Sequence, residues 1–305
     1  VESTSSDAAT YRSIGYYSDK LGHPAFATSY DTSRPSGSDT QTRGVGVFVN
    51  ANTIWDNKYF LDLIYRYEGS SRFGKNQRFA PFWSVGGGWN IHNEKFMKGT
   101  PVQLLKLRAS VGYLGNINFT AYQALTTYSY NSSYFYGKGT GATPITIGNP
   151  DLKWERTLST NIGLDFTAFR GRVDLSADYY IKNTDDLLLP ITKAPSVGVT
   201  TSLENIGEVQ NKGFELRLRT IPIQNKDWQW SLGLTYALNK NKIKKISNSL
   251  REQNEKNQSD NGVAPLPIYE EGQSLTALKV VPSAGIDPST GQEIFIKRNG
   301  AYTFV

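Results

Sequence analysis

Side chains that could do acid–base or nucleophilic chemistry are sparse and scattered in this chain. It has two histidines, His23 and His92, which lie far apart in the sequence, and it has no cysteine. A Ser-His-Asp arrangement is recognised by its geometry, which a sequence does not supply. His92 lies in a predicted turn beside Asn93 and Glu94, where we expect it to be exposed to solvent. We therefore predict that the chain is not an enzyme.

Two acidic segments could suggest a calcium site, and a glycine run could suggest a phosphate loop. Asp185 with Asp186, and Asp287 in Asp-Pro-Ser-Thr-Gly, lack the spacing of an EF-hand loop, and the second is typical of a turn. The glycines at 86–88 lie inside a strand pattern and are not followed by Lys-Ser/Thr and a helix. Small residues suit a bend or a close contact there. Without cysteine, disulfides and thiolate metal sites are excluded, and we expect no cofactor.

The charge and hydropathy of the chain narrow the class of protein further. The net charge is +6, and the one dense basic stretch holds Lys240, Lys242, Lys244 and Lys245. We interpret this stretch as a solvated strand end and expect no nucleic acid partner. Hydrophobic residues make up 38% of the chain, and no run of about 18 apolar residues predicts a transmembrane helix. A transmembrane barrel remains compatible, because only alternate residues of its strands face lipid.

The elements that would position any site are long strands with one apolar face and one polar face. In 172–182 the apolar set is Val173, Leu175, Ala177, Tyr179 and Ile181, and the polar set is Arg172, Asp174, Ser176, Asp178 and Lys182. Strands in globular proteins usually have five or six residues, whereas about ten suit a tilted crossing of a bilayer. We predict that the apolar set faces lipid and that the polar set faces a lumen.

Similar patterns recur along the chain, and the connections between them alternate in length. Strands are predicted within 45–51, 59–68, 83–91, 105–113, 158–166, 214–219 and 228–239, with a weaker one at 291–297. The connections 169–171 and 221–226 are short, whereas 114–151 and 183–207 are long. This alternation predicts an all-β, antiparallel up-and-down transmembrane barrel, with the two long connections at one end and the two short ones at the other. A count of eight or nine strands, without an obvious closing strand, indicates that the chain is a segment of a larger structure.

Several strings resemble the SusC/RagA family of TonB-dependent outer-membrane transporters from Bacteroidota. They are RYEGSSRFGKNQRFAPFWSVGGGWNI (66–91), FMKGTPVQLLKLRASVGYLGN (96–116), NPDLKWERT (149–157), DLSADYYIKNTDDLLL (174–189), NIGEVQNKGFEL (205–216) and AGIDPSTGQEIF (284–295). Their order matches the family, and NPDLKWERT is the most specific of them.

The resemblance implies an internal part of a barrel of about 22 strands in the outer membrane of a Gram-negative bacterium. Residues 1–41 would be an external loop or leading segment, and 42–305 would be barrel strands with long extracellular loops. The complete protein would import glycans or peptides, with a SusD-like surface lipoprotein as partner. It would draw energy from TonB through an N-terminal part, with its plug, that this sequence does not show. The barrel itself would contact membrane lipid.

Two sets of side chains are candidates for functional contacts. The charged residues predicted to face the lumen or the plug are Asp62, Arg66, Lys106, Arg108, Asp174, Asp178, Glu215, Arg217 and Arg219. The aromatic residues that could contact ligand or lid are Tyr122, Tyr128, Tyr130, Tyr134 and Tyr136, in the long connection 114–151. Packing of this loop against its neighbours is the favoured interpretation of the tyrosines.

Two other classes of protein stay open at this point. A soluble secreted all-β binding module, such as an adhesin or a carbohydrate-binding sandwich, would have shorter strands and a closed core. A small autonomous barrel, porin-like or enzymatic, would need no further strands. The sequence does not identify a substrate, because specificity would depend on loop geometry, the plug and the partner.

Overall fold

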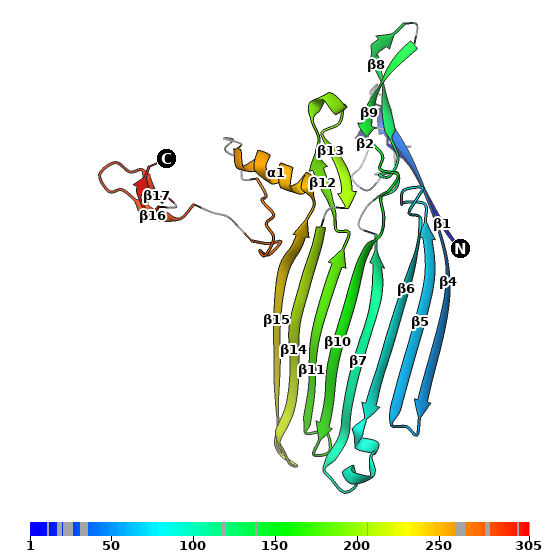
Figure 1. Cartoon of the computed structure of the whole chain (residues 1–305), viewed down its shortest axis with the longest axis vertical. Coiled ribbons are helices and arrows are strands. Elements are labelled where there is room, and N and C mark those ends of the chain that lie inside the picture. The colour runs from blue at the N-terminus through cyan, green and yellow to red at the C-terminus, as the bar shows by residue number, and fades with distance from the viewer. Residues whose placement is uncertain are drawn as a thin grey trace.

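A large antiparallel sheet dominates the computed structural model, which describes residues 1–10, 12–16, 20, 27–30, 36–117, 120–137, 139–205, 207–259, 266–277, 281–297 and 299–304. Figure 1 shows this sheet as a single layer of long strands. In sheet order they are β1 (Glu2–Thr10), β4 (Ser36–Trp55), β5 (Tyr59–Ser70), β6 (Phe79–Asn90), β7 (Val102–Asn116), β10 (Glu155–Ala168), β11 (Val173–Asp185), β14 (Gly207–Gln224) and β15 (Gln229–Ile246).

The two-sided pattern of the sequence is confirmed by the register of the strands. Leu175 of β11 lies opposite Phe166 of β10 and Leu218 of β14. Its neighbour Ser176 lies opposite Asp165 and Arg217, on the other face. Because side chains alternate along a strand, this register gives the sheet from β7 to β15 one mainly apolar face and one mainly polar face. On β4, β5 and β6 the polar face is interrupted by Phe48, Phe60, Ile64 and Phe82.

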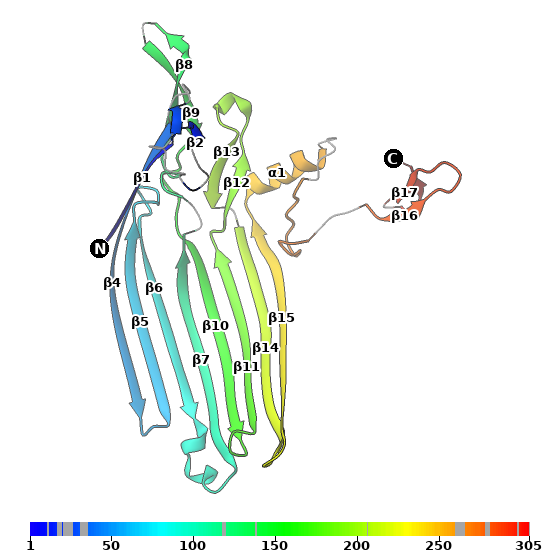
Figure 2. The ribbon, with the colours of Figure 1, turned by 180° about the vertical axis from the view of Figure 1, so that it is seen from behind.

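The connections alternate between the two ends of the sheet, as the sequence predicts. The loops that follow β7 and β11 leave from one end, and the turns at 169–172 and 225–228 lie at the other (Figure 2). The short-turn end also holds the 3₁₀ segments η2 (Ile91–Asn93) and η3 (Lys95–Met97). This placement follows from the antiparallel pairing of consecutive strands.

The two long connections, which the sequence predicts as loops, each contain a β-hairpin. Residues 114–151 include the end of β7 and a hairpin of β8 (Thr127–Tyr136) with β9 (Gly139–Thr146). The connection after β11 holds a second hairpin, β12 (Leu188–Thr192) with β13 (Thr201–Asn205), and the 3₁₀ segment η4 (Pro195–Val197). Beyond β15 comes α1 (Asn248–Ser259). No helix in the described part of the chain is long and apolar enough to span a bilayer.

The two ends of the chain form smaller paired elements. β1 pairs with the first half of β4, and β2 (Ser13–Tyr16) pairs with β3 (Ala27–Tyr30). Because β4 begins at Ser36, the boundary expected between residues 41 and 42 lies inside this strand. The weak strand predicted at 291–297 is β17 (Glu293–Ile296), which joins β16 (Ser283–Ile286) and β18 (Tyr302–Thr303) in a separate sheet.

The buried cores lie at the long-loop end rather than in the middle of the large sheet. One cluster consists of Phe73, Ala80, Phe82, Ala124, Leu152, Trp154 and Leu188. The other consists of Ile191, Val209, Ile243, Ile246 and Leu250. By contrast, large apolar side chains of the sheet's apolar face are exposed, among them Leu232, Leu234 and Leu238 of β15. The long strands and this exposed face do not fit the closed core of a soluble sandwich.

Candidate functional site

The charged residues that the sequence predicts to face a lumen all lie on the polar face of the large sheet. One row of paired residues runs from Arg108 on β7 through Gly163 and Asp178 to Glu215 on β14. Neighbouring rows on the same face hold Asp174 opposite Arg219 and Ser176 opposite Arg217. The strand register therefore brings these charges from β7 to β14 onto one surface.

Arg108 is the centre of an ionic cluster on this face. Its Nε donates to Asp165 Oδ2 at 3.1 Å, and its Nη2 donates to Asp178 Oδ2 at 2.7 Å. Ser176 Oγ donates to the other oxygen of Asp165 at 3.0 Å. Gly163 leaves room for the cluster, because a Cβ at this position would run into the Arg108 guanidinium. Asp165 was not among the predicted lumen-facing residues, although its place in the alternation of β10 puts it on this face.

The other members of the set lie outside this cluster, and their surroundings differ. Glu215, Arg217 and Arg219 are exposed, and none forms an ion pair with a described residue. Lys106 places its ammonium 4.3 Å from the centre of the Phe60 ring, and Arg66 pairs with Glu68 at 2.7 Å. The polar face thus combines a fixed ionic cluster with a group of free charges on β14.

The glycine run at 86–88 lies in β6, and one of its members is required by its surroundings. The ring of Phe60, on the neighbouring strand, lies where a Cβ of Gly88 would be, and the Leu107 carbonyl oxygen is 2.5 Å from that position. An aromatic ring that covers a glycine on the adjacent strand is a known way to fix register. This contact explains why a glycine stands at position 88, so no phosphate ligand is needed to account for it.

Three of the family-like strings meet at the long-loop end of the sheet, in a buried cluster that we call the loop junction (Phe73, Ala80, Phe82, Ala124, Leu152, Trp154 and Leu188). Trp154 stacks on Phe73 with ring centres 4.1 Å apart, and it meets Phe82 edge to face at 5.2 Å. Phe73 and Leu152 are 1% and 0% exposed, the deepest large side chains of the described residues. Packing of this depth fixes the two loops against each other.

Backbone and amide bonds reinforce the loop junction. Gly74 N donates to Leu152 O at 3.0 Å, and Asn76 Nδ2 donates to Asp151 Oδ1 at 2.8 Å. The Pro150 carbonyl approaches Gly74 so closely that no Cβ would fit there. The glycine of the RFG triplet at 72–74 is therefore needed for this approach.

Asn205 joins a fourth family-like string to the same region. Its amide oxygen accepts from Lys153 N at 3.2 Å, and its Nδ2 donates to the Lys153 and Asp186 carbonyls at 3.2 and 2.9 Å. Lys153 Nζ also pairs with Asp186 at 2.7 Å. Four strings that are distant in sequence thus form one connected unit, which no local pattern in the sequence predicts.

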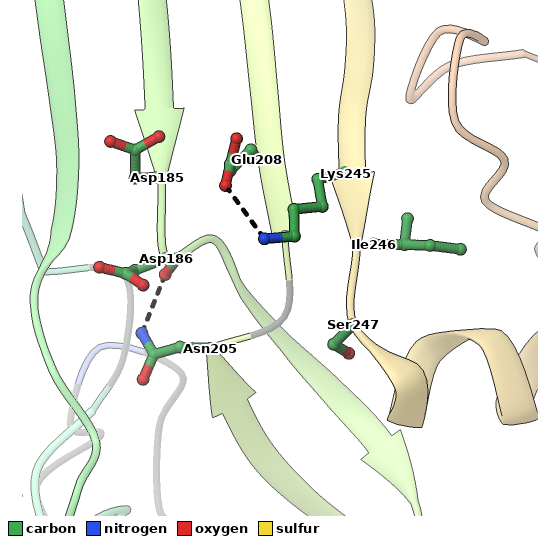
Figure 3. A pocket seen from close by; sticks show the side chains of 8 residues that line it. Asp185, Asp186, Asn205, Glu208, Lys245, Ile246 and Ser247 are labelled. Carbon is green, nitrogen blue, oxygen red and sulfur yellow. Dashed lines mark hydrogen bonds and ion pairs between the residues drawn. The ribbon is translucent and has the colours of Figure 1, made fainter.

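A small open cavity of about 190 Å³ lies next to Asn205, where β11, β14 and β15 end. Figure 3 shows the carboxylates of Asp185, Asp186 and Glu208 around it, with Lys245 reaching Glu208 at 3.9 Å. No group of three His, Asp or Glu side chains within the described ranges is placed to hold a metal ion. The acidic pair Asp185 and Asp186 is part of a mixed-charge wall.

The tyrosines of the long connection differ in their surroundings. The Tyr122 hydroxyl accepts a bond from Gln41 N at 2.8 Å, which fits the packing role favoured by the sequence. Tyr128 and Tyr130 of β8 are 59% and 77% exposed in this chain, so their part in packing or in contact with a ligand or lid stays a prediction. The side chains of Tyr134 and Tyr136 lie outside what the structure describes.

The remaining sequence candidates are the two histidines and the Asp287 segment. His92 is half-buried rather than exposed, because its ring Nδ1 lies 3.3 Å from the Leu105 carbonyl oxygen. His23 lies outside the described residues. Asp287 accepts bonds from Ser289 N and Oγ, each at 2.8 Å, and from Thr290 Oγ1 at 3.0 Å, as in the predicted turn. Gly291 has a φ of +70° there.

Comparison with known proteins places this arrangement in a family. The family model described as TonB dependent receptor-like, beta-barrel, matches residues 2–267. TonB-dependent receptor P3 of Formosa agariphila is 35% identical over 217 residues, which cover 70% of this chain and 22% of that protein. TonB-dependent receptor SusC of Bacteroides thetaiotaomicron is 33% identical over 215 residues, which cover 68% and 21%.

The solved structure of the RagAB peptide transporter gives the same result at the level of the fold. It superimposes with a TM-score of 0.79 and 26% identity, covering 99% of this chain and 36% of the other. The chain spans about a fifth of the length of the curated relatives that it matches. It belongs to the TonB-dependent receptor-like β-barrel family of the outer membrane, in the SusC/RagA group, and forms part of such a barrel.

Proposed function

We propose that this chain is part of the wall of a SusC-like importer, and that the complete protein carries peptides or glycans across the outer membrane. The observation that supports this most is the two-sided sheet. Its apolar face exposes Leu232, Leu234 and Leu238, which suits lipid, while its polar face holds the Arg108 cluster. Lipid-facing and lumen-facing residues alternate in this way in transmembrane barrels.

The polar face would contact a plug supplied by the rest of the same protein. The Arg108 cluster is already satisfied and stiffens the wall, whereas Glu215, Arg217 and Arg219 are free to bind charged or polar groups. Mixed signs argue against a pore selective for one charge. We propose a hydrogen-bonded contact between wall and plug at β14, and no catalytic role for the wall.

The long-loop end would be extracellular, because long loops face outward in bacterial outer-membrane barrels. The exposed Tyr128 and Tyr130, on the β8–β9 hairpin, would contact either the ligand or a SusD-like lipoprotein lid. RagAB is named a peptide importer, which is why peptides stand beside glycans as substrates. Energy would come from TonB through a part of the protein outside this chain.

The test uses the complete protein in its own bacterium. Deletion of the gene should abolish uptake of labelled peptides or of labelled glycans, and the wild-type gene should restore it. The double variant Arg217→Glu and Arg219→Glu should assemble in the membrane but restore uptake poorly. As a matched control, Lys98→Glu with Lys226→Glu, at the short-turn end, should restore it fully. Unchanged uptake of both nutrients after deletion would contradict the proposal.

A further inference from the structure

Three lysines stand together on the apolar face of the sheet, where β14 and β15 approach the long-loop end. Lys212 lies directly opposite Lys240, and Lys242 lies opposite Gln210 on the next same-facing pair. We call Lys212, Lys240 and Lys242 the lysine patch. They share the face of Phe214 and Leu238, because residues two apart on a strand point the same way.

The lysine patch is electrostatically unfavourable unless a bound anion offsets its positive charges. Like charges directly opposite each other on neighbouring strands destabilise a sheet. All three lysines are exposed, and none forms an ion pair with a described residue. Lys245, further along β15, does have a partner in Glu208. A bound anion would remove the repulsion between Lys212 and Lys240.

The position of the patch along the strands indicates which anion. On β15 the apolar face runs without interruption through Trp230, Leu232, Leu234, Tyr236 and Leu238, and the next residue on that face is Lys240. These nine residues, 230–238, are about the length that crosses the hydrocarbon core of a bilayer. The lysine ammoniums would therefore lie at the level of the lipid headgroups, with their alkyl stems along the apolar surface.

We propose that the lysine patch binds the phosphate of a glycolipid in the leaflet on the long-loop side of the barrel. The ligand is a lipid because the patch points away from the polar face and continues the apolar band. A phosphate group carries the negative charge that would offset the repulsion between the opposed ammonium groups. Asn183 and Gln210, whose side chains are bonded at 2.8 Å, continue the same polar row and offer further contacts to sugar hydroxyls. The inference rests on the proposed orientation of the barrel.

The test measures binding of purified diphosphoryl lipid A to the complete protein in detergent, by native mass spectrometry. Wild-type protein should retain the lipid, and the triple variant Lys212→Gln, Lys240→Gln and Lys242→Gln should bind it roughly a hundredfold more weakly, as the loss of three lysines near an anionic surface requires. The control variant Lys75→Gln, Lys256→Gln and Lys297→Gln removes the same charge elsewhere and should bind like wild type.

Two further arms separate the outcomes. Lipid A without phosphates should bind equally weakly to wild type and to the triple variant, and inorganic phosphate at millimolar concentration should not displace the lipid. Equal binding of diphosphoryl lipid A by wild type and the triple variant would overturn the proposal, as would tight binding of the dephosphorylated lipid. Nutrient uptake, measured separately, tests the importer function and does not depend on this result.

Discussion

The large sheet and the loop junction stabilise the molecule in opposite ways. In the sheet, both faces stay open and each residue is placed by its two neighbouring strands, as Leu175 is by Phe166 and Leu218. In the loop junction, Phe73 and Leu152 are completely enclosed by segments of distant sequence. The sheet therefore needs a surrounding medium to cover its apolar face, whereas the loop junction carries its own core. The first is suited to lipid, and the second to a rigid base for loops in water.

The largest effect should come from emptying the loop junction. Trp154→Ala removes the ring that stacks on Phe73 and leaves a cavity, so we expect a loss of about 3–5 kcal/mol in the stability of this region. Denaturant unfolding of the complete protein, followed by hydrogen exchange at 70–78, would measure it. Tyr302→Ala is the control, because Tyr302 is 70% exposed, lies outside the large sheet, and its loss should cost under about 1 kcal/mol. Equal losses would remove the distinction between the two regions.

A somewhat smaller effect should come from placing a charge on the apolar face of the sheet. Leu175→Arg should cost roughly 2–4 kcal/mol if position 175 lies at the bilayer midplane. Ser176→Arg is the matched control on the opposite face, where a wet or polar environment should accept the charge. Folding of the complete barrel into lipid vesicles would give both values. A cost for Ser176→Arg as large as that for Leu175→Arg would show that the two faces are not different.

The short turns provide a third and weaker comparison. Phe169 and Arg170 adopt left-handed φ values of +57° and +60°, which bulky residues rarely take, whereas the turn after β4 uses Asp56 and Asn57 at similar angles. The double change Phe169→Asn and Arg170→Gly should stabilise the barrel by about 0.5–1 kcal/mol. Asn57→Gly, in a turn already well suited, should change stability very little. A loss of stability in the double variant would mean that the two side chains make contacts worth more than the strain.

The smallest effect concerns the turn between β6 and β7. The pKa of the Glu94 carboxyl is lowered, chiefly by the bond that Trp89 donates, with further help from Tyr59 and Lys58. A lowered pKa means that this stabilisation is present above the ordinary value of 4.5 and is lost as the pH falls through the lower folded value. The protection of the amides at 91–101 against hydrogen exchange, measured relative to the intrinsic rate at each pH, should therefore fall under acid conditions. In Glu94→Gln, this protection should already be lower at neutral pH and should respond less to acid.

The same contrast explains what could be predicted from the sequence. The face of the sheet on which a side chain lies follows from a local period of two. The positions of Arg108 and Asp178 on the polar face could therefore be predicted residue by residue. The loop junction was not, because its contacts join residues such as Asn76 and Asp151, which are 75 positions apart. The strings at 66–91 and 149–157 could be noticed as a resemblance, but nothing local indicates that Phe73 and Trp154 touch. The high exposure of Tyr130 could not be predicted either, because a tyrosine side chain suits both packing and ligand binding.

One face of the large sheet should contact lipid and the other a polar environment, and spin labels measure this difference directly. Nitroxides would be attached one at a time at positions 175, 176, 234 and 235 of the complete protein in a lipid bilayer. We expect high accessibility to oxygen at 175 and 234, and low accessibility to oxygen at 176 and 235, with a period of two. Equal oxygen accessibility at adjacent positions, or the reverse order, would contradict it.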